Sequence, residues 1–229
     1  MTDVFAAERI IWVEGPTEEI YFPYIQGHNA KTSLSGITVT SVIATGDFNA
    51  KRIRRDLVFE VYRRLSKATA PLVKTVTFSF DRETLSEEQM SELKRDAGGR
   101  LAFLPRRHFE CYLLDPAAIA AFINSQVPDL AQKVTGADVL PCLQKSGGDP
   151  AFKASKQWND EITDEAWLAE VDAASLIKHV CNELTDNRLS FVKNRQSFDI
   201  LKHIMEHNPA SLGGLIGYVN SLYKMAMNE

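Results

Sequence analysis

Short apolar runs alternate with helix-like patterns along the first half of the chain. Runs rich in β-branched and aromatic residues predict four strands, at residues 9–13, 37–44, 72–80 and 100–104. Apolar residues at helical spacing predict helices that start at residue 16, after the turn at 46–49, at residue 86 and at residue 116. This alternation predicts an α/β fold with a mostly parallel four-stranded sheet flanked by helices.

The pattern changes beyond about residue 125. Strand signals fade, and helical periodicity appears over residues 164–184, 196–207 and 210–226. Residues 145–150, with two glycines and a proline, predict a loop. We therefore expect an α/β core over residues 1–124 and a C-terminal helical appendage over residues 125–229 that packs on this core.

The composition is that of an ordinary globular protein. Apolar residues make up 45% and charged residues 24% of the 229 residues, and the net charge is −4. The three cysteines, Cys111, Cys142 and Cys181, lie far apart, which favours reduced structural thiols in a cytoplasmic protein. No signal peptide is expected at the start of the chain. No apolar run approaches the roughly 18 residues of a membrane span, so no membrane partner is expected.

Acidic residues directly follow two of the predicted strands. Glu14 comes after the first strand, and Asp81 and Glu83 come after the third. The carboxyl ends of parallel strands meet at one edge of a sheet, where open α/β sheets bind their ligands. Carboxylates gathered there repel one another unless cations lie between them. The arrangement therefore predicts bound Mg²⁺ or Mn²⁺, with two ions expected.

Four segments resemble the Toprim domain, the metal-dependent fold of topoisomerases, primases and small nucleases. They are I-I-W-V-E-G-P-T-E at residues 10–18, A-T-G-D-F-N-A-K-R at 44–52, T-F-S-F-D-R-E at 77–83 and P-R-R-H-F-E-C-Y-L-L-D-P-A-A-I at 105–119. The resemblance is greatest to OLD-type nucleases and to Toprim effectors that are paired with ATPases in anti-phage defence. It implies a Toprim-like core and metal-dependent cleavage of phosphodiester bonds.

The resemblance also implies roles for individual acids. Glu14 matches the glutamate of the family, which acts as a general acid/base or a metal ligand. Asp81 and Glu83 match its Asp-x-Asp pair, with glutamate in place of the second aspartate, and are expected to act in catalysis as metal ligands. Glu18 and Glu110 are further candidate ligands, the latter within the H-x-E-x-Y-L-L segment. A solvated Glu18 is the open alternative.

Basic residues near these acids are candidate nucleic-acid contacts. Arg106 and Arg107 lie in the same segment as Glu110 and are candidate phosphate ligands. Arg52 and Arg55 belong to a basic helix that is expected either to track a nucleic-acid backbone or simply to be solvated.

Further segments carry residues that are candidates for chemical or structural roles. Lys193 precedes a predicted helix start and is the candidate for the catalytic lysine that OLD-like domains carry near the scissile phosphate; a solvated loop lysine is the alternative. His108 is expected to be a polar turn residue, and Glu19 to be solvated. Residues 203–207 spell H-x-x-E-H, the inverted zinc-protease motif, but the Asn-Pro pair at 208–209 ends that helix and the third ligand is missing.

These observations favour a metal-dependent nuclease, acting as the toxic effector of an anti-phage system. The chain contains no G-x-x-x-x-G-K-[ST] loop, so a separate ABC- or AAA-type ATPase is the expected regulator. The substrate is expected to be DNA or RNA, with tRNA among the candidates, and the protein to be a homodimer. Two alternatives stay open: a non-catalytic Toprim module that docks a regulator, and a primase-like or ribosomal-RNA-maturing Toprim enzyme.

Overall fold

The computed structural model describes residues 9–29, 36–41, 75–82, 85–152 and 159–227, which divide into two compact units. The first unit contains the sheet, helices α1 (Pro16–Asn29) and α3 (Glu87–Asp96), and helix α9 from Ile216 onward. The second spans Leu104–Leu215 together with Asp81–Thr84. The division thus falls after Phe103 rather than at the boundary predicted at residue 124. Glu83 and the predicted basic helix with Arg52 and Arg55 lie outside the described residues.

The first unit is built on a four-stranded parallel sheet with the strand order β2-β1-β3-β4. Its strands are β1 (Arg9–Val13), β2 (Ile37–Ser41), β3 (Thr75–Phe80) and β4 (Leu101–Phe103). β1 is paired on both sides, so that Val13 lies opposite Ser41 of β2 and Ser79 of β3. The predicted α/β class with a parallel sheet is confirmed. Because the strand order reverses direction between β1 and β3, the topological switch point lies between these two strands.

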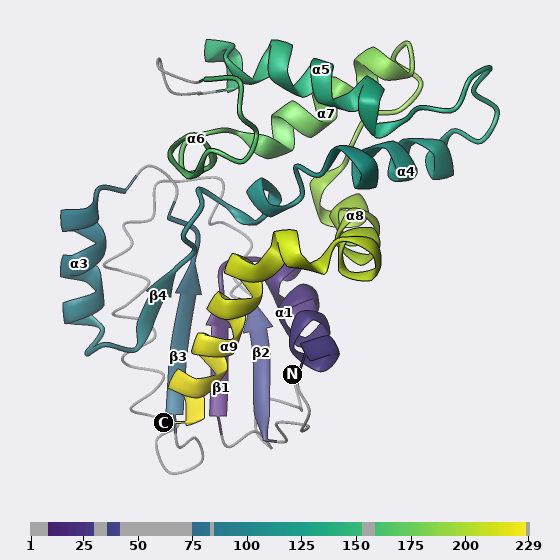
Figure 1. The fold of residues 1–229 in the computed structure, drawn as a ribbon. Coiled ribbons are helices and arrows are strands. Elements are labelled where there is room, and N and C mark those ends of the chain that lie inside the picture. Colours follow the sequence, from purple (N-terminus) through teal and green to yellow (C-terminus); the bar gives the residue numbers. More distant parts are fainter. Residues whose placement is uncertain (1–8, 30–35, 42–74, 83–84, 153–158, 228–229) are drawn as a thin grey trace. The chain divides into compact units, whose positions relative to one another are not determined.

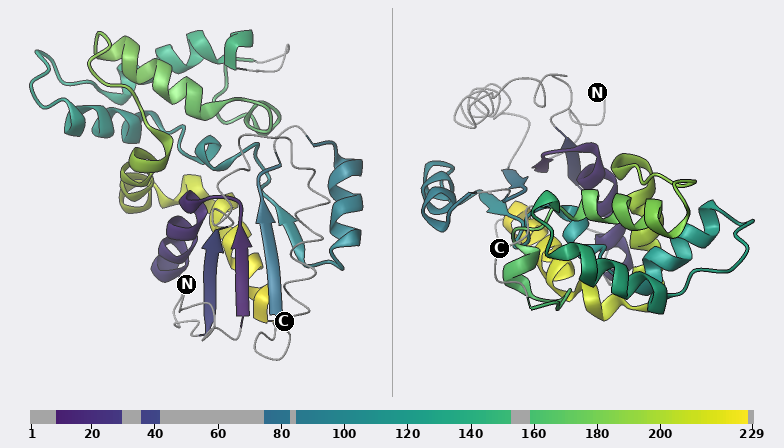
Figure 2. Two further views of the ribbon diagram at one scale, coloured as in Figure 1. Left: turned by 180° about the vertical axis from the view of Figure 1, so that it is seen from behind. Right: turned by 90° about the horizontal axis from the view of Figure 1, so that it is seen from above.

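Helix α9 (Gly213–Met227) covers one face of this sheet. Tyr218 of α9 shares a buried 2.7 Å hydrogen bond with the hydroxyl of Ser79 on β3. The same tyrosine ring meets Phe22 of α1 (Pro16–Asn29) edge-on, with ring centroids 6.2 Å apart. Figure 1 shows α9 crossing in front of the strands, and the reverse view in Figure 2 shows the strands in front of α9. These contacts hold both helices on the Ser79 side of the sheet.

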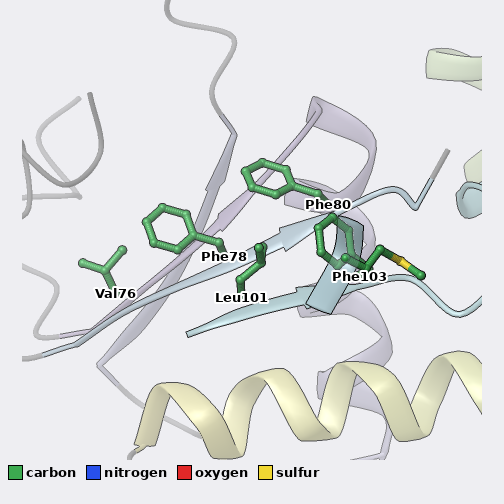
Figure 3. Packing of buried hydrophobic residues seen from close by; sticks show 6 residues of the cluster. Val76, Phe78, Phe80, Leu101 and Phe103 are labelled. Atoms are coloured by element: carbon green, nitrogen blue, oxygen red, sulfur yellow. The ribbon is translucent and has the colours of Figure 1, made fainter. Parts of the chain in front are cut away.

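The opposite face carries an apolar cluster. Side chains alternate along a strand, so Phe78 and Phe80 point away from the face that Ser79 occupies. Figure 3 shows them in a row with Val76 along β3, beside Leu101 and Phe103 of β4. Met90 of α3 (Glu87–Asp96) completes this cluster, which packs α3 against β4.

The predicted start of α3 is confirmed in detail. Ser86 is its N-cap, and the Ser86 hydroxyl accepts a hydrogen bond from the backbone N–H of Gln89. The Gln89 side chain accepts one from the backbone N–H of Ser86 in return, forming a capping box. After the helix, Gly98 and Gly99 have φ values of 61° and 76°, which only glycine adopts without strain, and they turn the chain into β4.

The second unit is helical in its described part (Figure 1). α5 contacts both α4 and α7, and α4 also contacts α8. Its α-helices are α4 (Pro116–Gln126), α5 (Gly136–Gly147), α6 (Glu165–Leu168), α7 (Ala173–Leu184) and α8 (Lys193–His207), and its 3₁₀ turns are η3 (Phe109–Tyr112), η4 (Pro150–Phe152) and η5 (Pro209–Leu212).

Three predicted boundaries in this unit were wrong. α5 was not predicted, and it includes the first residues of the expected loop at 145–150; a Thr135–Asp138 capping box starts this helix despite its internal Pro141. The helix expected over 164–184 is broken between α6 and α7, where Asp172 caps the start of α7. α8 begins at Lys193 rather than at residue 196, so Lys193 is a helical residue.

The cysteines match their prediction, because Cys111, Cys142 and Cys181 are all buried as free thiols. Burial raises the pKa of Cys181 to about 12, so that this thiol stays protonated at neutral pH. In the part of the chain that the structure describes, no helix is both long and apolar enough to cross a membrane.

Replacement of Tyr218 by phenylalanine tests the packing of α9 on β3. The Tyr218→Phe variant loses the hydrogen bond to Ser79. We expect the free energy of unfolding to fall by about 0.5–1.5 kcal/mol, measured by urea denaturation. The control is Tyr223→Phe on the same helix, since Tyr223 is also buried but its hydroxyl makes no hydrogen bond to the described residues. Equal losses of unfolding free energy in the two variants would show that the hydrogen bond between Tyr218 and Ser79 does not stabilise the fold.

Candidate functional site

The residues E-G-P-T-E at positions 14–18 form the turn from β1 into the first turn of α1. Pro16 occupies the first helical position, and the Glu18 carboxylate accepts a 3.1 Å hydrogen bond from the backbone N–H of Gly15. A Cβ atom on residue 15 would lie 3.1 Å from the same carboxylate oxygen, so this close approach favours glycine. Glu18 is buried, which excludes the solvated alternative, and one of its oxygens caps the helix.

Two candidate acids follow the strands on either side of the switch point. Glu14 directly follows β1, and Asp81 directly follows β3, the strand paired with β1. Asp81 is buried, whereas Glu14 is exposed. An exposed Glu14 remains accessible to a ligand from solvent, at the sheet edge where such folds bind their ligands.

Glu19 has a structural contact that the sequence did not reveal. Its carboxylate accepts a 3.0 Å hydrogen bond from the backbone N–H of Ser41 and another from the Ser41 hydroxyl. Ser41 is the last residue of β2. Glu19 therefore ties the first turns of α1 to the carboxyl end of β2, and the prediction that it is merely solvated was wrong.

A buried ion cluster lies in the second unit. Glu110 in η3 is fully buried, and its Oε2 lies 3.0 Å from Nδ1 of His108 and 3.1 Å from Nζ of Lys193. Both approaches are at ion-pair distance. The structure thus brings together two residues, Glu110 and Lys193, that the sequence had singled out separately. Lys193 is 40% exposed, so it also faces solvent at the start of α8.

The opposite charges in this cluster stabilise one another's ionised forms. Burial alone would raise the pKa of Glu110, but the contacts of His108 and Lys193 outweigh burial and hold it below its ordinary value. Burial alone would lower the pKa of His108, but Cys111 and Glu110 raise it to about 10. Glu110 is therefore ionised and His108 protonated at neutral pH.

His108 was expected to be a polar turn residue, and this was wrong. It is buried, and its Nε2 lies 3.9 Å from a carboxylate oxygen of Asp172. Asp172 also caps α7 by accepting a 3.1 Å hydrogen bond from the backbone N–H of Ser175. Alternating charges from Asp172 through His108 and Glu110 to Lys193 thereby connect the starts of α7, η3 and α8. The H-x-E spacing was the only signal of this cluster in the sequence, and nothing pointed to Asp172.

The two candidate phosphate ligands make contacts within their own unit. Arg106 lies 2.8 Å from Glu165, donates to the backbone carbonyl of Cys111 and stacks over the ring of Tyr112. Arg107 is buried and donates to the backbone carbonyl of Glu170 at 2.7 Å. As arranged here, Arg107 is not presented to a nucleic acid.

The donor chemistry of the acids fits a hard divalent cation only in part. Carboxylate oxygens are the ligands that Mg²⁺ and Mn²⁺ prefer. Oε1 of Glu110 is buried and accepts no hydrogen bond. A metal ion at Glu110 would therefore bind Oε1, while Oε2 stays paired with His108 and Lys193. Within the described ranges, which omit Glu83, no group of three or more His, Cys, Asp or Glu side chains could hold a metal ion.

Comparison with protein-family models, with curated proteins and with solved structures found no match to this chain. The protein is defined instead by its own features. It has a parallel α/β sheet whose switch-point strands are each followed by an acid, and a helical unit that contains the buried ion cluster.

Replacement of Glu110 by glutamine tests the buried ion cluster. We expect Glu110→Gln to lower the free energy of unfolding at pH 7 by about 3 kcal/mol, the lower end of the range for breaking a buried pair, because Lys193 is 40% exposed. The folded pKa of Glu110 is lowered, so its stabilising effect is present above its ordinary pKa and is lost as the pH falls below that value. The difference between variant and wild type should therefore shrink on acidification.

The control for this experiment is Glu165→Gln. Glu165 pairs with Arg106 but is 69% exposed, so its removal should cost under about 1 kcal/mol in the same urea titration. A Glu110→Gln variant as stable as Glu165→Gln at pH 7 would show that the buried contacts contribute nothing.

Proposed function

We propose that the protein is a metal-dependent nuclease of Toprim type that cleaves phosphodiester bonds in DNA or RNA. One observation carries this proposal. The two strands that flank the topological switch point are adjacent and parallel, and each is followed at its carboxyl end by a carboxylate, Glu14 or Asp81. In open α/β sheets, ligands bind outside the carboxyl ends of the strands at this point.

The proposed roles follow from burial and chemistry. Asp81 and Glu83 hold Mg²⁺ or Mn²⁺, which polarises the scissile phosphate when bound. Glu14 is exposed and accessible from solvent, which suits a general acid/base that exchanges protons with substrate or water. Glu18 has one oxygen committed to the cap of α1, so it serves chiefly to hold the turn that follows Glu14.

Lys193 is proposed to contact the substrate phosphate. Its partial exposure lets the ammonium group reach a phosphate, while the ion pair with the buried Glu110 restricts its position. Glu110 and His108 then act as positioning residues through Lys193. Because the sequence resembles Toprim effectors that are paired with ATPases in anti-phage defence, a separate ABC- or AAA-type ATPase is proposed to control the activity within such a system, with the nuclease acting as a homodimer.

The metal-binding part of the proposal predicts that Mn²⁺ affinity depends on Asp81. Calorimetry on Asp81→Asn should show affinity reduced by at least about 10–100-fold, the loss caused by removing even an outer-shell partner of a ligand. The matched control is Asp96→Asn, because Asp96 is exposed at the end of α3 and should not affect binding. Mn²⁺ binding that is unchanged in Asp81→Asn would place the metal elsewhere.

The catalytic part predicts that cleavage depends on Glu14. Purified protein is incubated with plasmid, single-stranded DNA and tRNA in the presence of Mg²⁺, Mn²⁺ or EDTA. The rate for Glu14→Gln should fall by about 10²–10⁴-fold, the usual contribution of a general acid/base. Glu88→Gln, at an exposed carboxylate in the first turn of α3, is the control and should cleave like wild type. Glu19 is unsuitable as a control because it holds Ser41.

The non-catalytic alternative has one observation in its favour. Glu18 caps a helix and Glu110 is paired with two cations, so two of the candidate metal ligands already have structural roles. A docking module predicts no cleavage of any of the three substrates in either metal, together with Mn²⁺ affinity that is the same in wild type and Asp81→Asn.

A further inference from the structure

The C-terminal half of α8 carries two histidines one helical turn apart. His203 and His207 are four residues apart, so they lie on the same face of the helix. His203 is half-buried and His207 is exposed, which leaves both rings accessible from solvent. These residues belong to the H-x-x-E-H sequence that does not fit a zinc protease, and the proposed nuclease function does not use them.

The two imidazole rings are stacked, so their in-plane lone pairs do not meet at one point. Their centroids are 4.1 Å apart and their planes are within 17° of parallel. To bind one ion with both rings, the His203 ring turns about its Cβ–Cγ bond while His207 stays anchored. Nδ1 of His207 lies 3.0 Å from the backbone carbonyl oxygen of His203, and because a carbonyl can only accept, Nδ1 carries the proton of the neutral ring. This leaves the lone pair of His207 on Nε2, the atom that points away from the backbone. A ring nitrogen anchored on a carbonyl in this way is the usual arrangement of a metal-ligating histidine.

The position of the pair on the helix also favours a cation. His207 is the last residue of α8, where the helix dipole presents its negative end. Positive charge is therefore stabilised beside these rings. Lys202, the residue before His203, contacts Asp199 at 3.3 Å and the ring of Phe198.

We propose that His203 and His207 form a two-imidazole site for a divalent late transition-metal ion such as Zn²⁺, Ni²⁺ or Cu²⁺. Imidazole nitrogens select these borderline ions, whereas the carboxylates proposed at the sheet edge select Mg²⁺ or Mn²⁺. Among the described residues no group of three metal-ligating side chains includes the pair, so water completes the coordination and the bound ion exchanges with solvent. The ion links successive turns and stabilises the end of α8.

Titration with Ni²⁺ tests this site directly. Protein without a polyhistidine tag is titrated by calorimetry in excess Mg²⁺, which keeps carboxylate sites occupied. We expect His203→Asn and His207→Asn each to weaken Ni²⁺ binding by at least about 10²-fold, because the second ring acts as a ligand tethered to the first. Ni²⁺ should also raise the melting temperature of wild type, and this increase should be lost in both variants.

A second histidine provides a matched control. His28 near the end of α1 places its Nδ1 3.1 Å from the backbone carbonyl of Tyr24 and its ring against the Tyr24 ring, at 4.3 Å between centroids. Its geometry resembles that of His207, but a tyrosine replaces the second histidine. His28→Asn should bind Ni²⁺ like wild type. Equal Ni²⁺ affinity in His207→Asn and wild type, or an equal loss in His28→Asn, would overturn the proposal without affecting the proposed nuclease function.

Discussion

The parallel pairing of β1 with a strand on each side is the constraint on which the candidate site depends. This pairing fixes the carboxyl end of β1 between Ser41 of β2 and Ser79 of β3. The turn that follows is then closed by local contacts, with Glu18 capping α1 on the N–H of Gly15 and Glu19 holding Ser41. Glu14 is left exposed at the switch point, beside the strand that leads into Asp81. The sheet itself therefore defines where a ligand would bind, and helix α9 supports that sheet through the contact of Tyr218 with Ser79.

The second unit depends on a different kind of interaction. Glu110 has no exposure, and an isolated carboxylate in such a place would be neutralised or excluded. Two cations on Oε2 keep it ionised, and one of them, Lys193, also reaches solvent. A buried ion pair is a weak source of net stability but a strong constraint on geometry once its partners are present. In this protein the constraint orients the start of α8 relative to η3, and it gives Lys193 a defined position instead of the freedom of a loop lysine.

Much of the fold could be predicted because it depends on local patterns. β1 and the capping box at Ser86 appear where short-range signals place them. Prediction failed where contacts between distant residues decide the outcome. The pairing of Glu19 with Ser41 and of His108 with Asp172 leaves no periodic trace in the sequence. α5 was missed because Pro141 and its terminal glycines are read as loop signals, although its N-terminal cap and its buried apolar positions favour a helix.

The proposed function requires that the carboxyl ends of β1 and β3 form a metal-binding centre. Anomalous diffraction from crystals soaked with Mn²⁺ locates such an ion without reference to activity. We expect a peak within coordination distance, roughly 2.0–2.6 Å, of a carboxylate oxygen of Asp81, at the edge of the sheet where Glu14 follows the paired strand β1. A Mn²⁺ peak located only at other residues, or no peak at this edge of the sheet at saturating Mn²⁺, would contradict it.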